Sequence, residues 1–396
     1  MDTTTTSRAR GLQPAKRMSR LGTESAFEVL AAARALEAQG HHVVHLEIGE
    51  PDFDTPKNIV DAGIKALKDG WTHYGPSAGL PDVRDAIAKD VSKRRGIKVD
   101  AENVVITPGA KPVMFYTMLD LVESGDEVIY PDPGFPIYES LVKFLEATPV
   151  PVLLKEENDF RLDVGELLDK VTDRTRLLII NSPHNPTGSV LTAADLEAIG
   201  KVCSERNIPV LADEIYSRII YDGEHRSIWS EPGMDELTII LDGMSKTYAM
   251  TGWRLGYGVM PEAMAKRVAQ LMTNSNSCTA SFSQRALMEG LTGDQSDVDK
   301  MVSTFKSRRE LVVKLLNDIP GVSCRMPAGA FYAFANVKSL GRNVKELADD
   351  LLQKHKVATL GGTAFGDGGE GYLRLSYAAS EADLREGIAR IARGLA

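Results

Sequence analysis

The sequence of 396 residues predicts an α/β fold in which a large domain holds a mostly parallel sheet between layers of helices. Between residues 58 and 296, stretches with helical spacing of apolar residues alternate with short, continuously apolar stretches of strand length. Strands that are apolar on both faces and alternate with helices are typical of a parallel sheet covered on both sides. The hydrophobic fraction of 43% and the charged fraction of 26% are those of a globular protein, and the chain is long enough to form two cores.

The elements of the large domain can be placed from their apolar patterns and from the residues that end them. Several strand-like stretches end in Pro, Asn or Asp, which interrupt regular structure and begin loops. The predicted strands span residues 103–107, 127–131, 177–181, 209–213 and 238–242. The predicted helices span residues 59–70, 82–96, 111–125, 137–147 and 193–207.

The C-terminal part of the chain has a different pattern and predicts a smaller α+β domain. A long helix over 298–319 precedes strand-like stretches at 330–337 and 371–378, which flank a helix over 344–355. We expect the first twenty residues to form an arm that is either a flexible tail or packed on a partner subunit. The predicted divisions are an arm and part of the small domain at 1–57, the large domain at 58–296 and the small domain at 297–396.

Charge and cysteine content restrict the class of protein. The net charge of −9 and the pI near 5.4 are unlike those of a nucleic-acid-binding protein. The sequence contains neither a signal peptide nor an apolar run of transmembrane length. Cys203, Cys278 and Cys324 are far apart and form no CxxC motif, as expected for a metal-free protein in the reducing cytoplasm.

Two polar segments are interpreted as exposed surface. His41, His42 and His45 have no acidic residue at ligand spacing, so we expect solvated side chains and no metal site. The basic run at residues 93–96 closes a predicted helix, and we interpret it as the solvated end of that helix.

Several polar side chains follow neighbouring strands and are expected at one edge of the sheet. Asp213 ends one strand and Tyr216 follows it, while Asn185 follows a second strand in a proline-rich turn. Lys246 follows a third strand in a stretch with few other charges, and the next cation along the chain is Arg254. Ligands of such sheets bind where the strands end. An amine, an acid, an amide, a phenol and a guanidinium together suit a phosphorylated pyridine aldehyde.

The motifs that carry these residues resemble those of the class I aminotransferases, which are pyridoxal-phosphate enzymes of fold type I. The similarity runs from about residue 46 to residue 378 through "GEPDF", "YGPSAGLPDVRDAIA", "NSPHNPTG", "DEIY", "SKTYAMTGWRLG" and "YLRLSYA". The combination is specific, and it is similar to bacterial aspartate aminotransferases. The resemblance implies a homodimer with shared active sites. It also implies transfer of the amino group of an L-amino acid to a 2-oxo acid.

The resemblance assigns five residues to the reacting part of the pyridoxal 5'-phosphate. Lys246 is expected to form the Schiff base and then to move the substrate α-proton. Asp213 is expected to keep the pyridine nitrogen protonated. Asn185 and Tyr216 are expected to bind the ring oxygen, and Arg254 to bind the phosphate.

Further residues are assigned to the cofactor by the same resemblance. The backbone at Gly109 and Ala110, where a helix begins, is expected at the phosphate together with Ser245. Phe135 is expected to stack on the ring. Tyr74 resembles the tyrosine that reaches the phosphate of the neighbouring subunit. The chain departs from the S-x-S-K pattern at Gly243, so only one serine hydroxyl remains there.

The substrate is expected to bind beside the cofactor. The resemblance implies that Arg374 holds the α-carboxylate and that Gly49 contributes its backbone, with Phe135 and Asn185 lining the site. Lys111 lies next to the phosphate-binding backbone and corresponds to a lysine that binds a distal carboxylate. Aspartate or glutamate is therefore expected as one partner. The matching threonine of that subgroup is Ala26 here, so alanine and aromatic donors remain open.

Two other functions remain open at this point. The same fold also carries pyridoxal-phosphate lyases and synthases of the carbon–sulfur β-lyase and aminocyclopropane-carboxylate synthase types, and fold alone does not separate these reactions. A cofactor-binding regulator would need a DNA-binding head. Only about fifty residues precede the large domain, and they show no recognition-helix pattern.

Overall fold

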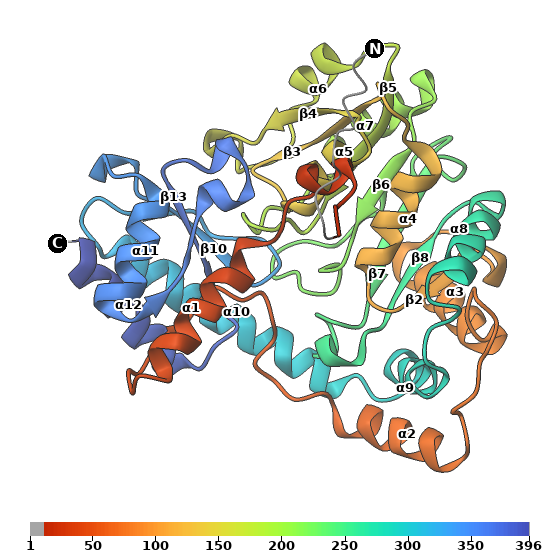
Figure 1. The fold of residues 1–396 in the computed structure, drawn as a ribbon, viewed down its shortest axis with the longest axis horizontal. Coiled ribbons are helices and arrows are strands. Elements are labelled where there is room, and N and C mark those ends of the chain that lie inside the picture. The colour runs from red at the N-terminus through yellow and green to blue at the C-terminus, as the bar shows by residue number, and fades with distance from the viewer. Residues whose placement is uncertain (1–11, 396) are drawn as a thin grey trace, which may run out of the picture.

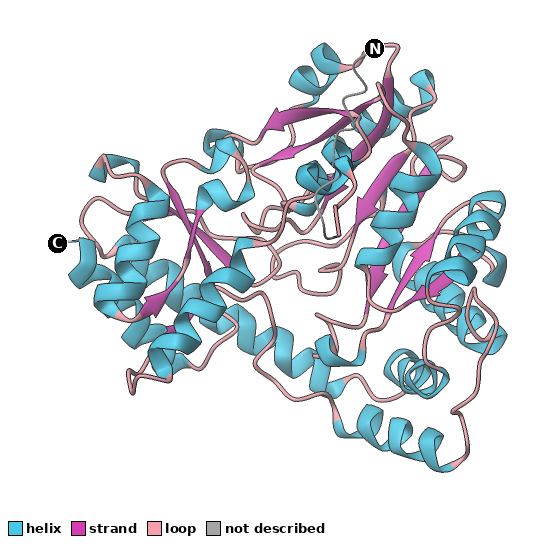
Figure 2. Cartoon of the chain, in the orientation of Figure 1, coloured by secondary structure: helices cyan, strands magenta, loops and turns pink. Residues whose placement is uncertain are grey.

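The centre of the protein is a seven-stranded mixed sheet, seen in a computed structural model that describes residues 12–395 (Figures 1 and 2). Six strands run in one direction, and β8 alone runs antiparallel to its neighbours β2 and β7. The prediction of a mostly parallel sheet is confirmed. In spatial order the strands are β2 (Val104–Thr107), β8 (Gly256–Val259), β7 (Thr238–Gly243), β6 (Val210–Asp213), β5 (Thr175–Asn181), β3 (Glu127–Asp132) and β4 (Thr148–Leu153).

Helices cover both faces of this sheet because its strands alternate their apolar side chains between two cores. On one face, Val105, Leu177 and Ile239 pack with residues of α4, α5 and α8. On the other face, Leu178 and Val210 pack with α6 and α7, and α3 and α9 cover the β2–β8 end. The helices are α2 (Lys57–Lys68), α3 (Pro81–Arg95), α4 (Lys111–Leu121), α5 (Ile137–Phe144), α6 (Val164–Lys170), α7 (Ala193–Arg206), α8 (Glu262–Ser275) and α9 (Ser281–Thr292).

A second unit contains a four-stranded antiparallel sheet in the order β12-β13-β10-β9, and it lies on the left in Figure 1. Its strands are β9 (Ser323–Cys324), β10 (Tyr332–Asn336), β12 (Leu360–Gly361) and β13 (Tyr372–Ser376). Its helices are α10 (Ser296–Asn317), α11 (Val344–His355) and α12 (Glu381–Leu395).

The N-terminal part of the chain joins this second unit. Strand β1 (Val44–His45) pairs in parallel with β11 (Val357–Ala358), and α1 (Ser25–Glu37) contacts β11 and β12. These pairings support a small domain built from both ends of the chain, while the boundaries at residues 57 and 296 remain a prediction. Residues 1–11 of the predicted arm lie outside the described residues.

Short 3-10 helices link the longer elements. They are η1 (Lys16–Arg20), η2 (Ala101–Asn103), η3 (Glu156–Asn158), η4 (Ile228–Ser230), η5 (Thr251–Trp253), η6 (Lys338–Leu340), η7 (Gly362–Phe365) and η8 (Asp367–Gly369). Within residues 12–395, none of the helices has the combined length and apolar character needed to cross a bilayer.

Candidate active site

A cavity of about 550 Å³ lies at the carboxyl ends of β5, β6 and β7, between the large sheet and the second unit. This is the edge at which the sequence places its polar constellation. The structure brings most of the predicted site residues together there, from segments far apart in the sequence. The predicted residues that line the cavity are Gly49, Ala110, Lys111, Phe135, Asn185, Asp213, Tyr216, Ser245, Lys246, Arg254 and Arg374.

Lys246 enters the cavity from the segment that follows β7, and its amine donates a hydrogen bond to the carbonyl oxygen of Gly49. Burial lowers the pKa of this amine to about 8, against the opposing effect of the Glu50 carboxylate. A larger fraction of uncharged amine follows at neutral pH than for an exposed lysine. This favours attack on a carbonyl carbon.

Asp213 ends β6 at the floor of the cavity and is buried. Its Oδ2 accepts a hydrogen bond of 2.7 Å from the Tyr138 hydroxyl, and its Oδ1 accepts one of 3.3 Å from the backbone N–H of Ile215. Burial raises the pKa of Asp213 to about 6. Both partners are neutral groups, so this carboxylate is suited to accept a charged N–H from a bound group.

Tyr138 was not predicted as part of the site. It lies in a helix with apolar periodicity, where an aromatic residue is usually interpreted as core. Its ring is fully buried, and only its hydroxyl reaches the carboxylate.

Asn185 and Tyr216 are both buried beside the cavity but make different contacts. The Asn185 backbone N–H donates to Asn181, whereas its side-chain Oδ1 has no partner among the described residues. The Tyr216 hydroxyl is 2.6 Å from the hydroxyl of Tyr332, another residue that the sequence did not indicate. A buried polar atom without a partner costs free energy, so the unpaired Asn185 oxygen indicates space for a ligand atom.

The start of α4 forms a narrow cradle at one end of the cavity. Gly109 has a φ of +93°, and a Cβ atom there would come within 2.2 Å of Nη2 of Arg254. Arg254 also donates a hydrogen bond of 2.8 Å to the Thr251 carbonyl oxygen. Gly256 of β8 lies against the same turn, because a Cβ on it would be 2.4 Å from the backbone nitrogen of Ala110. The N–H of Gly109 itself donates to the carbonyl oxygen of Thr107, and the N–H groups that follow it begin α4. A helix start beside a guanidinium is typical of a phosphate site.

Arg374, on β13, brings a cation to the cavity from the second unit. Its Nη2 donates to the carbonyl oxygen of Glu47, and its guanidinium lies 4.6 Å and 5.1 Å from the ring centres of Tyr332 and Phe365. Its Nε has no partner among the described residues. Burial lowers the pKa of this group. A planar guanidinium with a free edge is suited to a carboxylate.

Lys111 points into the cavity, as predicted, but already has an acidic partner. Its Nζ bonds to Oε1 of Glu24 and lies 5.5 Å from the ring centre of Phe135 and 5.9 Å from that of Phe27. Glu24 was not predicted, because the two residues are far apart in the sequence and no local motif connects them.

Tyr74 lies elsewhere, on the loop after α2, and is 89% exposed. It is outside the group of residues that line this cavity in the described chain. A role at a phosphate would therefore require contact with another subunit.

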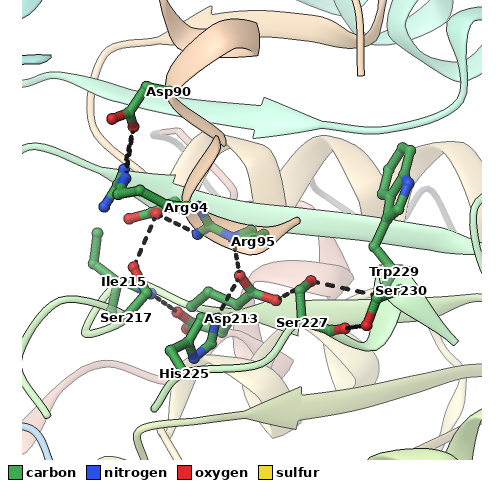
Figure 3. A network of polar contacts seen from close by, with 12 residues as sticks. Asp90, Arg94, Arg95, Asp213, Ile215, Ser217, His225, Ser227, Trp229 and Ser230 are labelled. Carbon is green, nitrogen blue, oxygen red and sulfur yellow. Dashed lines mark hydrogen bonds and ion pairs between the residues drawn. The ribbon is translucent and has the colours of Figure 1, made fainter. Parts of the chain in front are cut away.

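The interpretation of residues 93–96 as a solvated helix end is wrong for Arg95. Its side chain is 1% exposed, and its Nε and Nη2 each lie 2.6 Å from a carboxylate oxygen, of Glu214 and Asp242 respectively (Figure 3). Glu214 also accepts hydrogen bonds from Ser227 and His225. This buried network directly adjoins Asp213 and joins the ends of β6 and β7 to α3.

The expectation of solvated histidines is wrong for His45. Its Nδ1 lies 2.8 Å from Oε1 of buried Glu47, and its Nε2 lies 3.1 Å from Oε1 of Glu37. The hydrogen bond to Glu47 raises the pKa of His45 to about 9, although burial opposes this. Glu47 follows β1 by two residues and Glu37 ends α1, and the search for metal-ligand spacing did not reveal these ion pairs.

Comparison with known proteins agrees with this geometry. The chain is 43% identical to the aspartate aminotransferase of Pyrococcus horikoshii, over 89% of this chain and 90% of that protein. It is 40% identical to the aromatic-amino-acid aminotransferase 2 of Thermococcus litoralis, over 90% of this chain and 93% of that protein. The solved aspartate aminotransferase from Thermus thermophilus with maleate superposes with a TM-score of 0.93 at 33% identity, covering 97% of this chain and all of that one.

The sequence model of the family described as "Aminotransferase class I and II" matches residues 41–391, which is most of the chain. The relatives named above are matched over nearly their whole length as well. On both grounds, this chain belongs to the class I and II aminotransferases.

Proposed function

We propose that this enzyme transfers the amino group of an L-amino acid to a 2-oxo acid with pyridoxal 5'-phosphate as cofactor. The observation that carries the proposal is that one cavity is lined by the Lys246 amine, the buried carboxylate of Asp213 and Arg254, which lies against Gly109 at the start of α4. The buried Oδ1 of Asn185 has no partner among the described residues, and the cofactor's ring oxygen would bind beside it. The described residues therefore fit the cofactor.

Each end of the cofactor has a matching group. Arg254, Ser245 and the backbone at Gly109 and Ala110 would hold the phosphate, and Phe135 would cover the ring. Asp213 would hold the ring N–H. Tyr216 and Asn185 would hold the ring oxygen. When bound, the cofactor supplies an aldehyde for the amino group and a ring that accepts electrons from the α-carbon.

The chain supplies the proton transfer and the orientation of the substrate. Arg374 and the Gly49 backbone would bind the α-carboxylate, which directs the α-hydrogen towards Lys246. The Lys246 amine, with its pKa lowered to about 8, would take the α-proton at Nζ and return it at the cofactor side. Tyr216 and Tyr332 are both buried beside the cavity, and their rings pack edge to face.

We propose aspartate or glutamate as one partner because a second cation, Lys111, lines the cavity that holds Arg374. Relatives named aspartate aminotransferases, and a similar structure whose title names the dicarboxylate maleate, support this choice. Lys111→Ala is expected to raise KM for aspartate and glutamate by about tenfold to a hundredfold, the effect of a charge-assisted bond. KM for alanine and phenylalanine should change less than threefold. An equal rise in KM for all four donors would contradict the dicarboxylate proposal.

We also propose a cytoplasmic homodimer in which Tyr74 of each subunit completes the phosphate site of the other. The exposure of Tyr74 supports this, because the side chain does not reach the cavity of its own chain. Cys203, Cys278 and Cys324 are free thiols, as expected in a reducing compartment.

The reaction type can be tested with the enzyme loaded with pyridoxal phosphate and given aspartate alone. Transfer predicts one equivalent of 2-oxo acid per site and then a stop, until 2-oxoglutarate is added. A lyase would release ammonia or pyruvate continuously. Lys246→Ala should abolish turnover, whereas Lys266→Ala, at an exposed lysine of α8, should leave it unchanged. Wild-type turnover by the Lys246 variant without added amine would contradict the mechanism.

A further inference from the structure

The Glu24–Lys111 pair occupies part of the cavity that the substrate must use. Both residues line this cavity, together with Arg374 and Lys246. The Glu24 side chain is 17% exposed, whereas the Lys111 side chain is 50% exposed. The Glu24 side chain is therefore less accessible to solvent than the lysine that it pairs with.

Glu24 is held in place from both sides. Just before it, the backbone N–H of Gly22 donates a hydrogen bond of 2.8 Å to the Ser140 hydroxyl, and Arg20 donates to the carbonyl oxygen of Lys143 on α5. Just after it, α1 begins and packs against the second unit. The carboxylate thus lies where the chain crosses between the two units, and contacts on either side fix its position near Lys111.

Lys111 begins α4, where the helix dipole destabilises a positive charge. A nearby anion therefore stabilises the Lys111 ammonium. Within the described residues, Glu24 is the acidic residue whose carboxylate pairs with the Lys111 ammonium. The Glu24 carboxylate also acts to raise the pKa of the Lys246 amine, which is consistent with its position inside the cavity. A second carboxylate brought to Lys111 by a substrate would meet electrostatic repulsion from the first.

We propose, on the basis of the aminotransferase function proposed above, that Glu24 is an internal competitor for the distal carboxylate of acidic substrates. An acidic substrate must displace the Glu24 carboxylate from Lys111, so its ion pair with Lys111 contributes less binding free energy than it would if Lys111 had no partner. A neutral substrate leaves the pair intact, with its two charges cancelled. Glu24 therefore sets the ratio between acidic and neutral donors.

The surroundings of the pair suit a neutral or aromatic side chain. The rings of Phe27 and Phe135 flank Lys111, and both line the cavity. With Lys111 neutralised by Glu24, these rings form an apolar wall that an aromatic donor can contact. One site can in this way accept two substrate classes without any change in its cations.

The direct test is Glu24→Gln in the holoenzyme, with kcat/KM measured for aspartate, glutamate, alanine and phenylalanine. The ratio of acidic to neutral kcat/KM is expected to rise about tenfold, because the competing charge is lost while a similar shape remains. Glu28→Gln is the matched control, since Glu28 lies one turn further on in α1, is exposed and does not line the cavity. The control should leave the ratio unchanged. An equal change on all four donors with Glu24→Gln would overturn the proposal.

A double-mutant cycle separates competition at Lys111 from a general charge effect. In a Lys111→Ala background, Glu24→Gln should raise the ratio by clearly less than in wild type, because only direct repulsion between Glu24 and the substrate carboxylate remains to be removed. An undiminished tenfold rise without Lys111 would show that Glu24 acts through its charge alone and does not compete for Lys111, and it too would overturn the proposal.

Succinate binding gives a readout that does not depend on turnover. The thermal shift of the holoenzyme with succinate should report an affinity about tenfold higher in Glu24→Gln than in wild type, whereas 3-phenylpropionate should bind both equally. If no donor is transaminated, the proposed function fails while succinate binding still tests the pair. If wild type is active but the variant shows neither the altered ratio nor tighter succinate binding, only the role of Glu24 fails.

Discussion

Replacing Arg95 with methionine should destabilise the enzyme strongly, although Arg95 lies outside the cavity. The variant keeps the long side chain but leaves Glu214 and Asp242, 4% and 3% exposed, without their cation. Burial alone would raise the pKa of Glu214, but the Arg95 guanidinium and His225 hold it at about 2. Breaking a buried ion pair by removing one partner typically costs about 3–5 kcal/mol.

The cost should stay within that range despite two orphaned carboxylates. Ser227 and His225 still bond Glu214, and Ser217 and Tyr257 each lie 3.2 Å from Asp242. Glu214 can also take up a proton once the guanidinium is gone, which limits the penalty. We therefore expect about 3–5 kcal/mol in total rather than twice that amount.

The assay is urea unfolding of the holoenzyme, followed by fluorescence and by loss of activity. Arg94→Met is the matched control: Arg94 is adjacent on α3, its side chain is 24% exposed, and it pairs with Asp90 one turn away. Ion pairs one turn apart on a helix typically contribute about 0.3–0.5 kcal/mol. A loss below about 1 kcal/mol for Arg95→Met, or equal losses for the two variants, would refute the view that the buried network holds α3 to the sheet. Where unfolding is irreversible, half-lives at fixed temperature replace the equilibrium free energies.

Three shorter predictions address other sites. The pKa of His45 is raised to about 9 in the folded state. The contribution of the charged imidazole to the free energy of unfolding is therefore complete below pH 6.5 and is lost as pH rises through 9. After allowance for solvent at a side chain that is 33% exposed, about 1–2 kcal/mol should disappear over this window, and His45→Gln should flatten the pH dependence of unfolding. Tyr74→Phe should weaken cofactor retention on dialysis, and a monomer that keeps full cofactor occupancy would contradict the shared site. Gly109→Ala should reduce cofactor affinity at least about tenfold by displacing Arg254, as measured by equilibrium titration, and unchanged affinity would argue against the cradle.

Much of the fold was predictable because the inner strands are apolar on both faces. The stretches that became β5 and β7 are continuously buried over most of their length, so their sequence signal is strong. β4 was missed because it is an edge strand with two prolines and several exposed positions. β8 was missed because its sequence, Gly-Tyr-Gly-Val, is short and weak in strand propensity.

The candidate site was predictable where local motifs carry it and unpredictable where distant segments meet. Lys246 and Asp213 lie at strand ends within recognisable motifs, so resemblance identifies them. Tyr332 and Glu24 reach the same cavity from the second unit and from the segment before α1, with no local signal. The burial of Arg95 was not predicted, because a basic run at a helix end is usually hydrated. Only the tertiary structure shows that Arg95 pairs with the buried carboxylates of Glu214 and Asp242.

The pairing of β1 with β11 also constrains the order in which the chain can fold during translation. Val44 and His45 find their partners, Val357 and Ala358, more than 300 residues later in the chain. At a synthesis rate of about 5–20 residues per second, the early strand waits on the order of 15–60 seconds before its partner exists. During translation, the large sheet can assemble while this strand keeps its backbone N–H and C=O groups unpaired. Arg374, which brings a cation to the cavity from β13, is translated later still, so the lining of the cavity is completed only near the end of synthesis.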